Sequence, residues 1–208
     1  MTGLQIDLNI YPDEAALVQA LQNGEHDACA CMLKQFAPRV YAVAMRMMGD
    51  PDEAEEVLQE TFISACKNIH RFEGRSALNT WLHRIATNAA LMRLRKRKNK
   101  EVSLDNPIES LDGDDIPRQI EDWDYYPADL ALNSETRDVL EQAIATLPDT
   151  LRSVFVLREI EGYSTAEVAE MLDISVSAAK VRLHRARLRL RELLTPYFTE
   201  PTAPGEMP

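Results

Sequence analysis

Apolar residues recur every three or four positions along most of the chain, and stretches in which apolar and polar residues alternate are few. Such spacing places the apolar side chains on one face of an α-helix. The pattern therefore predicts an all-α protein. We expect helices at residues 13–22, 27–48, 51–69, 77–98, 134–146 and 150–161, followed by one helix on each side of Asp173.

The last two predicted helices have the pattern of a helix-turn-helix. Ser164 and Glu167 form an S-x-x-E capping box, which starts the first of them. Residues 173–175 are expected to form the turn. Six apolar residues of the second helix share one stripe that we expect to be buried: Val176, Ala179, Leu183, Ala186, Leu190 and Leu193.

The rest of that second helix is densely basic. We expect DNA contacts from its other faces, at Ser177, Lys180, Val181, Arg182, His184, Arg185 and Arg187. Long donors such as Lys180 and Arg185 suit guanine edges or phosphate oxygens. An ordinary solvated face and an anionic membrane surface are the alternatives. The membrane is disfavoured because the outward stripe lacks Trp and Phe.

Charge is distributed unevenly along the 208 residues, whose formal net charge is −11. Residues 101–135 contain eleven acidic residues and one basic residue, whereas residues 81–100 contain seven Lys or Arg and no acid. The net charge therefore does not exclude a nucleic-acid partner, because two basic patches lie on either side of the acidic segment.

The three cysteines, Cys29, Cys31 and Cys66, form no C-x-x-C pair, and we expect reduced thiols in a cytosolic protein. The four isolated histidines lack metal-ligand spacing, so we expect neither a metal nor another cofactor. No secretory signal pattern or run of eighteen apolar residues is present in the sequence, so a cytoplasmic location without membrane insertion is expected.

Domain boundaries follow from where the helical pattern stops. Prolines recur among acids between residues 99 and 133. We predict a helical bundle at 1–98, a flexible acidic linker at 99–133, a helix-turn-helix domain at 134–195 and a disordered tail at 196–208. The linker is a passive spacer or, alternatively, an acidic segment that lies on a basic surface.

With both basic helices placed, the chain resembles the sigma-70 family of bacterial transcription initiation factors, in particular its extracytoplasmic-function (ECF) group. The resemblance covers nearly the whole sequence. It is carried by DEAEEVLQETF at 52–62, by FEGRS at 72–76 with TWLHRIATN at 80–88, and by residues 147–194. It implies a sigma region 2 bundle and a sigma region 4 helix-turn-helix, which recognise the minus-ten and minus-thirty-five promoter elements.

The same resemblance implies partners on RNA polymerase core, namely the β′ clamp helices and the β flap, together with promoter DNA and an anti-sigma factor. Core binding is assigned to Asp52, Glu55, Glu56, Gln59 and Glu60. On spacing alone, these acids are equally compatible with a solvated helix face.

For the minus-ten element, the resemblance implies a pocket for a flipped base at Phe72, Ser76 and Asn88, with Arg75 beside it. An aromatic wall with amide and hydroxyl groups suits an unstacked base, although Phe72 is equally suited to the core. Phosphate contacts are expected from Arg93, Arg95, Lys96, Arg97 and Lys98. A solubilising basic helix end is the alternative.

Two rival classes remain to be weighed. A stand-alone helix-turn-helix regulator would bind its DNA without polymerase. A DNA-processing enzyme would need a nucleophile or clustered carboxylates, whereas Ser, His and Asp are scattered along this chain. We therefore expect no enzymatic activity.

Overall fold

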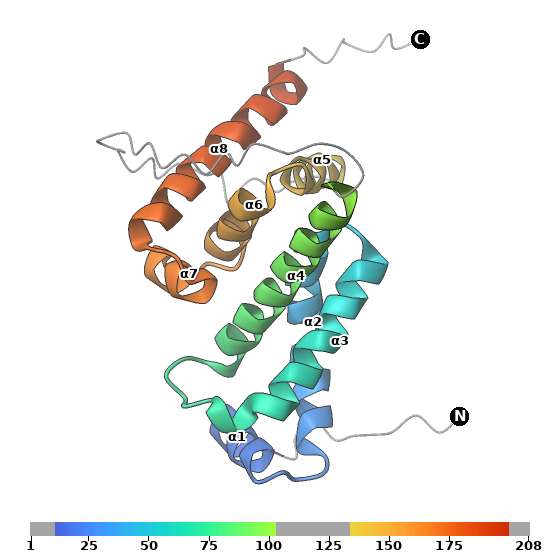
Figure 1. Ribbon diagram of the computed structural model, residues 1–208, viewed down its shortest axis with the longest axis vertical. Helices are drawn as coiled ribbons and strands as arrows, with labels where there is room; N and C mark the ends of the chain where they lie inside the picture. Colours follow the sequence, from blue (N-terminus) through green and yellow to red (C-terminus); the bar gives the residue numbers. More distant parts are fainter. Residues whose placement is uncertain (1–10, 103–133, 200–208) are drawn as a thin grey trace, which may run out of the picture. The chain divides into compact units, whose positions relative to one another are not determined.

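The computed structural model describes residues 11–102 and 134–199, and all regular structure in these two ranges is helical. The all-α fold class is confirmed. The helices form two compact units, one consisting mainly of α1 to α4 and the other mainly of α5 to α8 (Figure 1). The central part of the predicted linker and the end of the predicted tail, residues 103–133 and 200–208, lie outside the described residues.

The helix boundaries of the first unit are set by short polar residues and a glycine. Its helices are α1 (Glu14–Gln22), α2 (Ala28–Met48), α3 (Pro51–Asn68) and α4 (Leu78–Val102), with a 3-10 turn at Ile69–Arg71. The Asp13 and Asp50 carboxylates accept amides at the starts of α1 and α3, at 2.8 and 2.9 Å. Gly49 ends α2 in the left-handed conformation, with φ of 70°.

The core of the first unit is formed by the apolar stripes of all four helices. The stripe predicted for α2 is buried, at Phe36, Val40, Val43 and Met47. Helix α3 contributes Ala54, Phe62 and Ala65, and α4 contributes Leu78, Leu82, Ala86, Ala90 and Leu94. This packing fixes which sides of α3 and α4 remain exposed.

Cys29 and Cys66 form a disulfide in this unit, so the expectation of three reduced thiols is wrong for this pair. Packing of α2 against α3 brings their Cα atoms to 6.1 Å, a separation that a disulfide spans. The two cysteines lie 37 positions apart in sequence, and no motif indicates their pairing. Cys31 is buried and is not part of the disulfide.

The second unit consists of α5 (Ser134–Ala145), α6 (Asp149–Phe155), a π-helical turn at Val156–Ile160, α7 (Thr165–Leu172) and α8 (Val176–Thr199). The predicted capping box is confirmed. The Ser164 amide donates to the Glu167 carboxylate at 2.8 Å, and the Glu167 amide donates to the Ser164 hydroxyl at 3.2 Å. The hydrogen bonds from Ser164 also lower the pKa of Glu167.

The turn between α7 and α8 is sharp. Asp173 has a φ of 55°, in the left-handed region that few residues other than glycine adopt. The Ser175 hydroxyl then accepts the Ala178 amide at 3.1 Å and caps α8. The helix-turn-helix predicted from the sequence is therefore present in detail.

A buried arginine closes the other end of this unit. The Arg152 guanidinium donates to the carbonyls of Ala145 and Leu147, at 2.7 and 2.8 Å, and lies 3.6 Å from the Asp149 carboxylate. These contacts satisfy carbonyls at the C-terminal end of α5, which have no partner within that helix. Arg152 thus joins α6 to α5 inside the core.

Several boundaries and two core assignments differ from expectation. Helix α4 continues four residues beyond the predicted end, to Val102. Helix α8 continues past Pro196 to Thr199, because one missing amide near an exposed helix end leaves the remaining hydrogen bonds in place. Val176 of the predicted stripe is 44% exposed, since it is the first residue of α8. Leu193 is only half-buried. Among the described residues, no helix is long and apolar enough to cross a membrane.

Candidate polymerase and promoter interfaces

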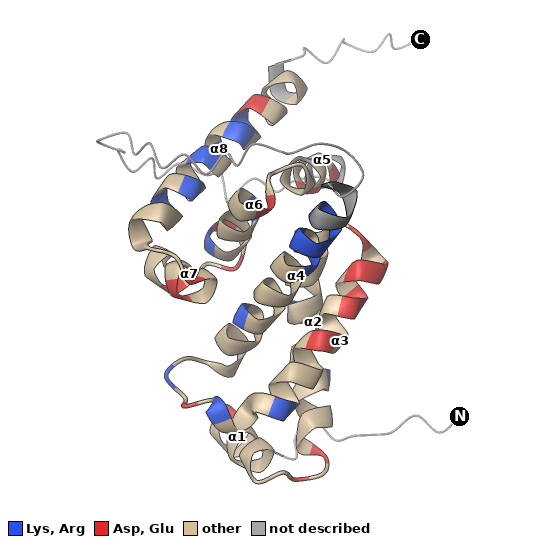
Figure 2. Cartoon of the chain, viewed as in Figure 1, with Lys and Arg blue, Asp and Glu red and all other residues tan. Residues whose placement is uncertain are grey.

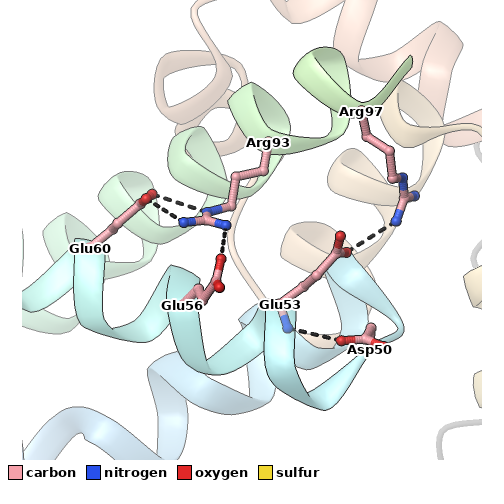
Figure 3. A network of polar contacts seen from close by, with 6 residues as sticks. All are labelled: Asp50, Glu53, Glu56, Glu60, Arg93 and Arg97. Atoms are coloured by element: carbon pink, nitrogen blue, oxygen red, sulfur yellow. Dashed lines mark hydrogen bonds and ion pairs between the residues drawn. The ribbon is translucent and has the colours of Figure 1, made fainter. Parts of the chain in front are cut away.

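Ion pairs connect the N-terminal part of α3 to the C-terminal half of α4. The Arg93 guanidinium binds the carboxylates of Glu56 and Glu60, and Arg97 Nη1 lies 3.0 Å from Glu53 Oε2 (Figure 3). A second contact joins Arg93 Nε to Glu60 at 3.2 Å. The hydrogen bonds from Arg93 lower the pKa of Glu60, with a further contribution from the charge of Lys96. We call the five ion-paired side chains the α3–α4 network: Glu53, Glu56, Glu60, Arg93 and Arg97.

The network separates the polar residues of α3 into two stripes. Glu53, Glu56 and Glu60 are spaced three and four residues apart and face the cations of α4. Asp52, Glu55 and Gln59 have the same spacing one position earlier, so their stripe is rotated by about 100° around the helix. All three residues of this second stripe are exposed and lie outside the network. We call them the outer stripe.

The basic end of α4 is likewise divided. Arg95, Lys96 and Lys98 are exposed and outside the network, whereas Arg93 and Arg97 are part of it. Figure 2 shows the acidic positions of α3, in red, beside the basic end of α4, in blue. Two of the five predicted phosphate-binding residues therefore already have carboxylate partners within the first unit.

The loop after the 3-10 turn places its polar residues outward and its aromatic ring inward. Phe72 is buried, with its ring centroid 5.3 Å from that of Trp81, and its carbonyl accepts a hydrogen bond from Gln22 at 3.0 Å. Ser76 and Arg75 are exposed, and Arg75 is paired with Glu73. In this structure Phe72 is a core residue, so its use as a pocket wall would require the loop to open.

Asn88 is exposed on α4 and lies at a cavity of about 360 Å³ between α3 and α4. The cavity is lined by Glu60, Ser64, Ile85, Asn88, Ala89, Met92, Arg93 and Lys96. Among the described residues, this lining brings Asn88 together with the network but includes neither Phe72 nor Ser76. The sequence did not indicate Met92, whose side chain is 58% exposed.

The outward face of α8 is open at its N-terminal half. Ser177, Lys180 and Arg185 are exposed, and Val181, Arg182 and His184 are half-buried. The Ser177 hydroxyl lies 2.9 Å from that of Ser175. All seven predicted contact residues are thus at least partly accessible on one continuous helix, although Arg187 is paired with Glu159.

Arg187 differs from the other six predicted contact residues because its side chain forms an ion pair that stabilises the fold. Its Nη2 donates to Glu159 Oε1 at 2.8 Å, and the Glu159 side chain is only 10% exposed. This pair joins α8 to the π-helical turn that precedes α7. No sequence signal indicated Glu159, since the two partners lie 28 positions apart.

Comparisons with known proteins agree with this architecture. Residues 32–100 match the family Sigma-70 region 2, and residues 137–190 match Sigma-70, region 4. The ECF RNA polymerase sigma factor SigW of Bacillus subtilis is 36% identical over 85% of this chain and 94% of its own length. The ECF RNA polymerase sigma-E factor of Haemophilus influenzae is 31% identical over 88% of this chain and 96% of its own.

Among solved structures, the sigma factor RpoE from Bartonella quintana, in complex with the anti-sigma factor NepR, has a TM-score of 0.59 and 27% identity. The match covers 81% of this chain and 98% of that one. The chain belongs to the ECF group of the sigma-70 family of transcription initiation factors. It binds RNA polymerase core and promoter DNA, and it directs the polymerase to promoters.

Proposed function

We propose that the outer stripe of α3, namely Asp52, Glu55 and Gln59, is the centre of the surface that docks on polymerase core. The division of α3 into two stripes carries this proposal, because the outer stripe presents two carboxylates that the α3–α4 network does not use. Glu56 and Glu60 act at the edge of that surface. The expected partner surface is basic, and by family resemblance it is formed by the β′ clamp helices.

Promoter contacts are divided between the two units in this proposal. Asn88, with Ser76 and the cations Arg95, Lys96 and Lys98, binds the melted minus-ten strand. Ser177, Lys180, His184 and Arg185 of α8 enter the major groove of the minus-thirty-five element. The exposure of Ser177, Lys180 and Arg185, with His184 half-buried beside them in sequence, supports this assignment. Phe72 joins the base pocket only when the loop opens, and Arg187 acts chiefly as a positioning residue.

Regulation and location follow from the same proposal. An anti-sigma factor is the expected antagonist, since the Bartonella quintana relative was solved in complex with one. The second unit is expected to meet the β flap. The protein would act in the bacterial cytoplasm, where the polymerase and its promoters are, and we assign it no catalytic chemistry of its own.

Binding of purified core enzyme to charge-reversal variants tests the docking surface. Asp52→Lys combined with Glu55→Lys should weaken core binding by about tenfold or more, because like charges would face the basic partner. Asp138→Lys, an exposed acid of α5 outside this surface, is the matched control. Unchanged core binding of the double variant would disprove the assignment. A tight, sequence-specific footprint without polymerase would instead favour a stand-alone regulator.

A further inference from the structure

The disulfide between Cys29 and Cys66 involves two residues that have no assigned part in polymerase or promoter binding. Cys29 is in the first turn of α2, and Cys66 is in the last turn of α3. Both residues are half-buried, which leaves them accessible to small molecules. The third cysteine, Cys31, is 2% exposed and is not part of the bond.

The position of this bond gives it mechanical consequences. It closes a segment with a sequence separation of 37 residues, which contains nearly all of α2 and α3. Cys66 is three residues before the 3-10 turn Ile69–Arg71, and that turn leads directly into Phe72 and the exposed loop after it. The crosslink therefore holds the helix end from which this loop begins.

We propose that Cys29 and Cys66 are a reversible redox site at which hydrogen peroxide forms, and cellular dithiols break, a crosslink that stabilises the first unit. That the bond meets cellular dithiols assumes a cytoplasmic protein, and this location rests on the proposed function. In a compartment that keeps thiols reduced, disulfides are usually transient and redox-sensing. Two accessible cysteines held at a Cα separation of 6.1 Å by helix packing can close the bond without rearranging the fold.

The chemistry balances in two steps. One cysteine thiolate attacks a peroxide oxygen, which forms a sulfenic acid and releases hydroxide. The hydroxide combines with the proton that the thiol had lost and becomes water. The second thiolate then attacks that sulfur, and the sulfenic hydroxyl leaves with a proton as a second water. Overall, two thiols are oxidised by two electrons to a disulfide and one peroxide is reduced to two waters. A dithiol reverses the reaction by thiol–disulfide exchange.

Cys31 supplies an internal control. Because its side chain is buried, it should react with peroxide much more slowly than the other two cysteines. The C31A variant should therefore retain the redox response, whereas C29S and C66S should each abolish it. The crosslink lowers the conformational entropy of the unfolded chain. The oxidised unit should therefore melt roughly 5–15 °C higher than the reduced unit.

The test uses the full chain and needs no polymerase. Reduced protein is treated with a small excess of peroxide, and its thiols are then titrated in denaturant. The expected count falls from three to one, peptide mapping finds Cys29 joined to Cys66, and dithiothreitol restores three thiols. Melting temperatures of the wild type, C31A, C29S and C66S are measured in both states.

The outcomes separate this proposal from its neighbours. Three remaining thiols after peroxide, or a bond made by Cys31, would overturn the site. An equal rise in melting temperature for wild type and C29S would show that the crosslink does not stabilise the unit. Resistance of the bond to a cytosol-like glutathione buffer would mark it as a permanent structural disulfide and overturn its reversibility. Loss of core binding by the outer-stripe variants affects none of these readouts, so failure of the docking proposal is recognised separately.

Discussion

The two units each present a basic helix, yet the cations of α4 and α8 have different surroundings. On α4, Arg93 binds the exposed carboxylates of Glu56 and Glu60, and Arg97 binds the half-buried carboxylate of Glu53. On α8, Lys180 and Arg185 are exposed in the N-terminal half of the helix, whereas Arg187 binds the nearly buried carboxylate of Glu159. Two helices with similarly basic sequences therefore differ in which of their cations stabilise the fold and which remain available for recognition.

The buried His83 should make the stability of the first unit sensitive to acid, whereas the histidine described in the second unit, His184, is only half-buried. Burial, with a smaller contribution from the charge of Arg39, lowers the pKa of His83 to about 4. The unfolded chain takes up a proton near pH 6.5, so stability is full above that pH and is lost as the pH falls toward 4. The loss should reach about 3 kcal/mol.

Trp81 fluorescence in a Trp123→Phe background reports unfolding of the first unit, because Trp81 is then the sole tryptophan. His83→Gln should flatten the dependence of the free energy of unfolding on pH between 6.5 and 4. His26→Gln, at an exposed position of the same unit, should leave that dependence unchanged. An unaltered slope in His83→Gln would show that His83 is not the responsible group.

Arg187→Ala should destabilise the second unit by about 2–3 kcal/mol, since it leaves the Glu159 carboxylate nearly buried without its donor. Denaturant unfolding followed by circular dichroism measures the change. Glu159→Leu combined with Arg187→Leu removes both charges and should be less harmful than Arg187→Ala. If the double variant is the more damaging, packing of the side chains matters more than their charges.

Arg185→Ala should cost about 1–3 kcal/mol of binding to the preferred upstream element and relax selectivity at one base pair, if its contact is bidentate. Arg191→Ala, farther along α8, should weaken all sequences alike and reduce the salt dependence by about one phosphate contact. Holoenzyme binding to a set of upstream sequences at several salt concentrations measures both. Equal losses on every sequence for Arg185→Ala would reassign it to the backbone.

Arg93→Ala should change the stability of the first unit by less than about 1 kcal/mol, because its partners Glu56 and Glu60 remain hydrated when it is removed. The small loss should shrink further in high salt. Unfolding of the Trp123→Phe protein with and without Arg93→Ala measures it. A loss as large as that of Arg187→Ala would remove the distinction drawn between α4 and α8.

Local features of this fold could be predicted because local physics produces them. The capping box of Ser164 and Glu167 is encoded within four residues, and the stripes of α2 and α8 are encoded in helical periodicity. Periodicity assigns a face to each residue but does not say how far the neighbouring helix covers it. For this reason Val176 was placed in the core, although it begins α8 in the open.

The candidate sites were predictable in composition but not in pairing. Arg93 and Glu56 lie 37 residues apart, Arg187 and Glu159 lie 28 apart, and the disulfide joins residues 37 apart. Each contact depends on how two helices pack, which no spacing rule describes. The same packing turned Phe72 inward and placed Met92 beside Asn88.

The bond between Arg187 and Glu159 also limits how this protein could be re-engineered. A recognition helix is often regarded as a cassette that can be exchanged to redirect a transcription factor to new promoters. Here the cassette has a fixed anchor, because Glu159 lies outside α8 and requires a guanidinium at position 187. Reprogramming should therefore vary Ser177, Lys180, His184 and Arg185 and retain Arg187. A library built on that rule would keep folded members while altering the DNA sequences they select.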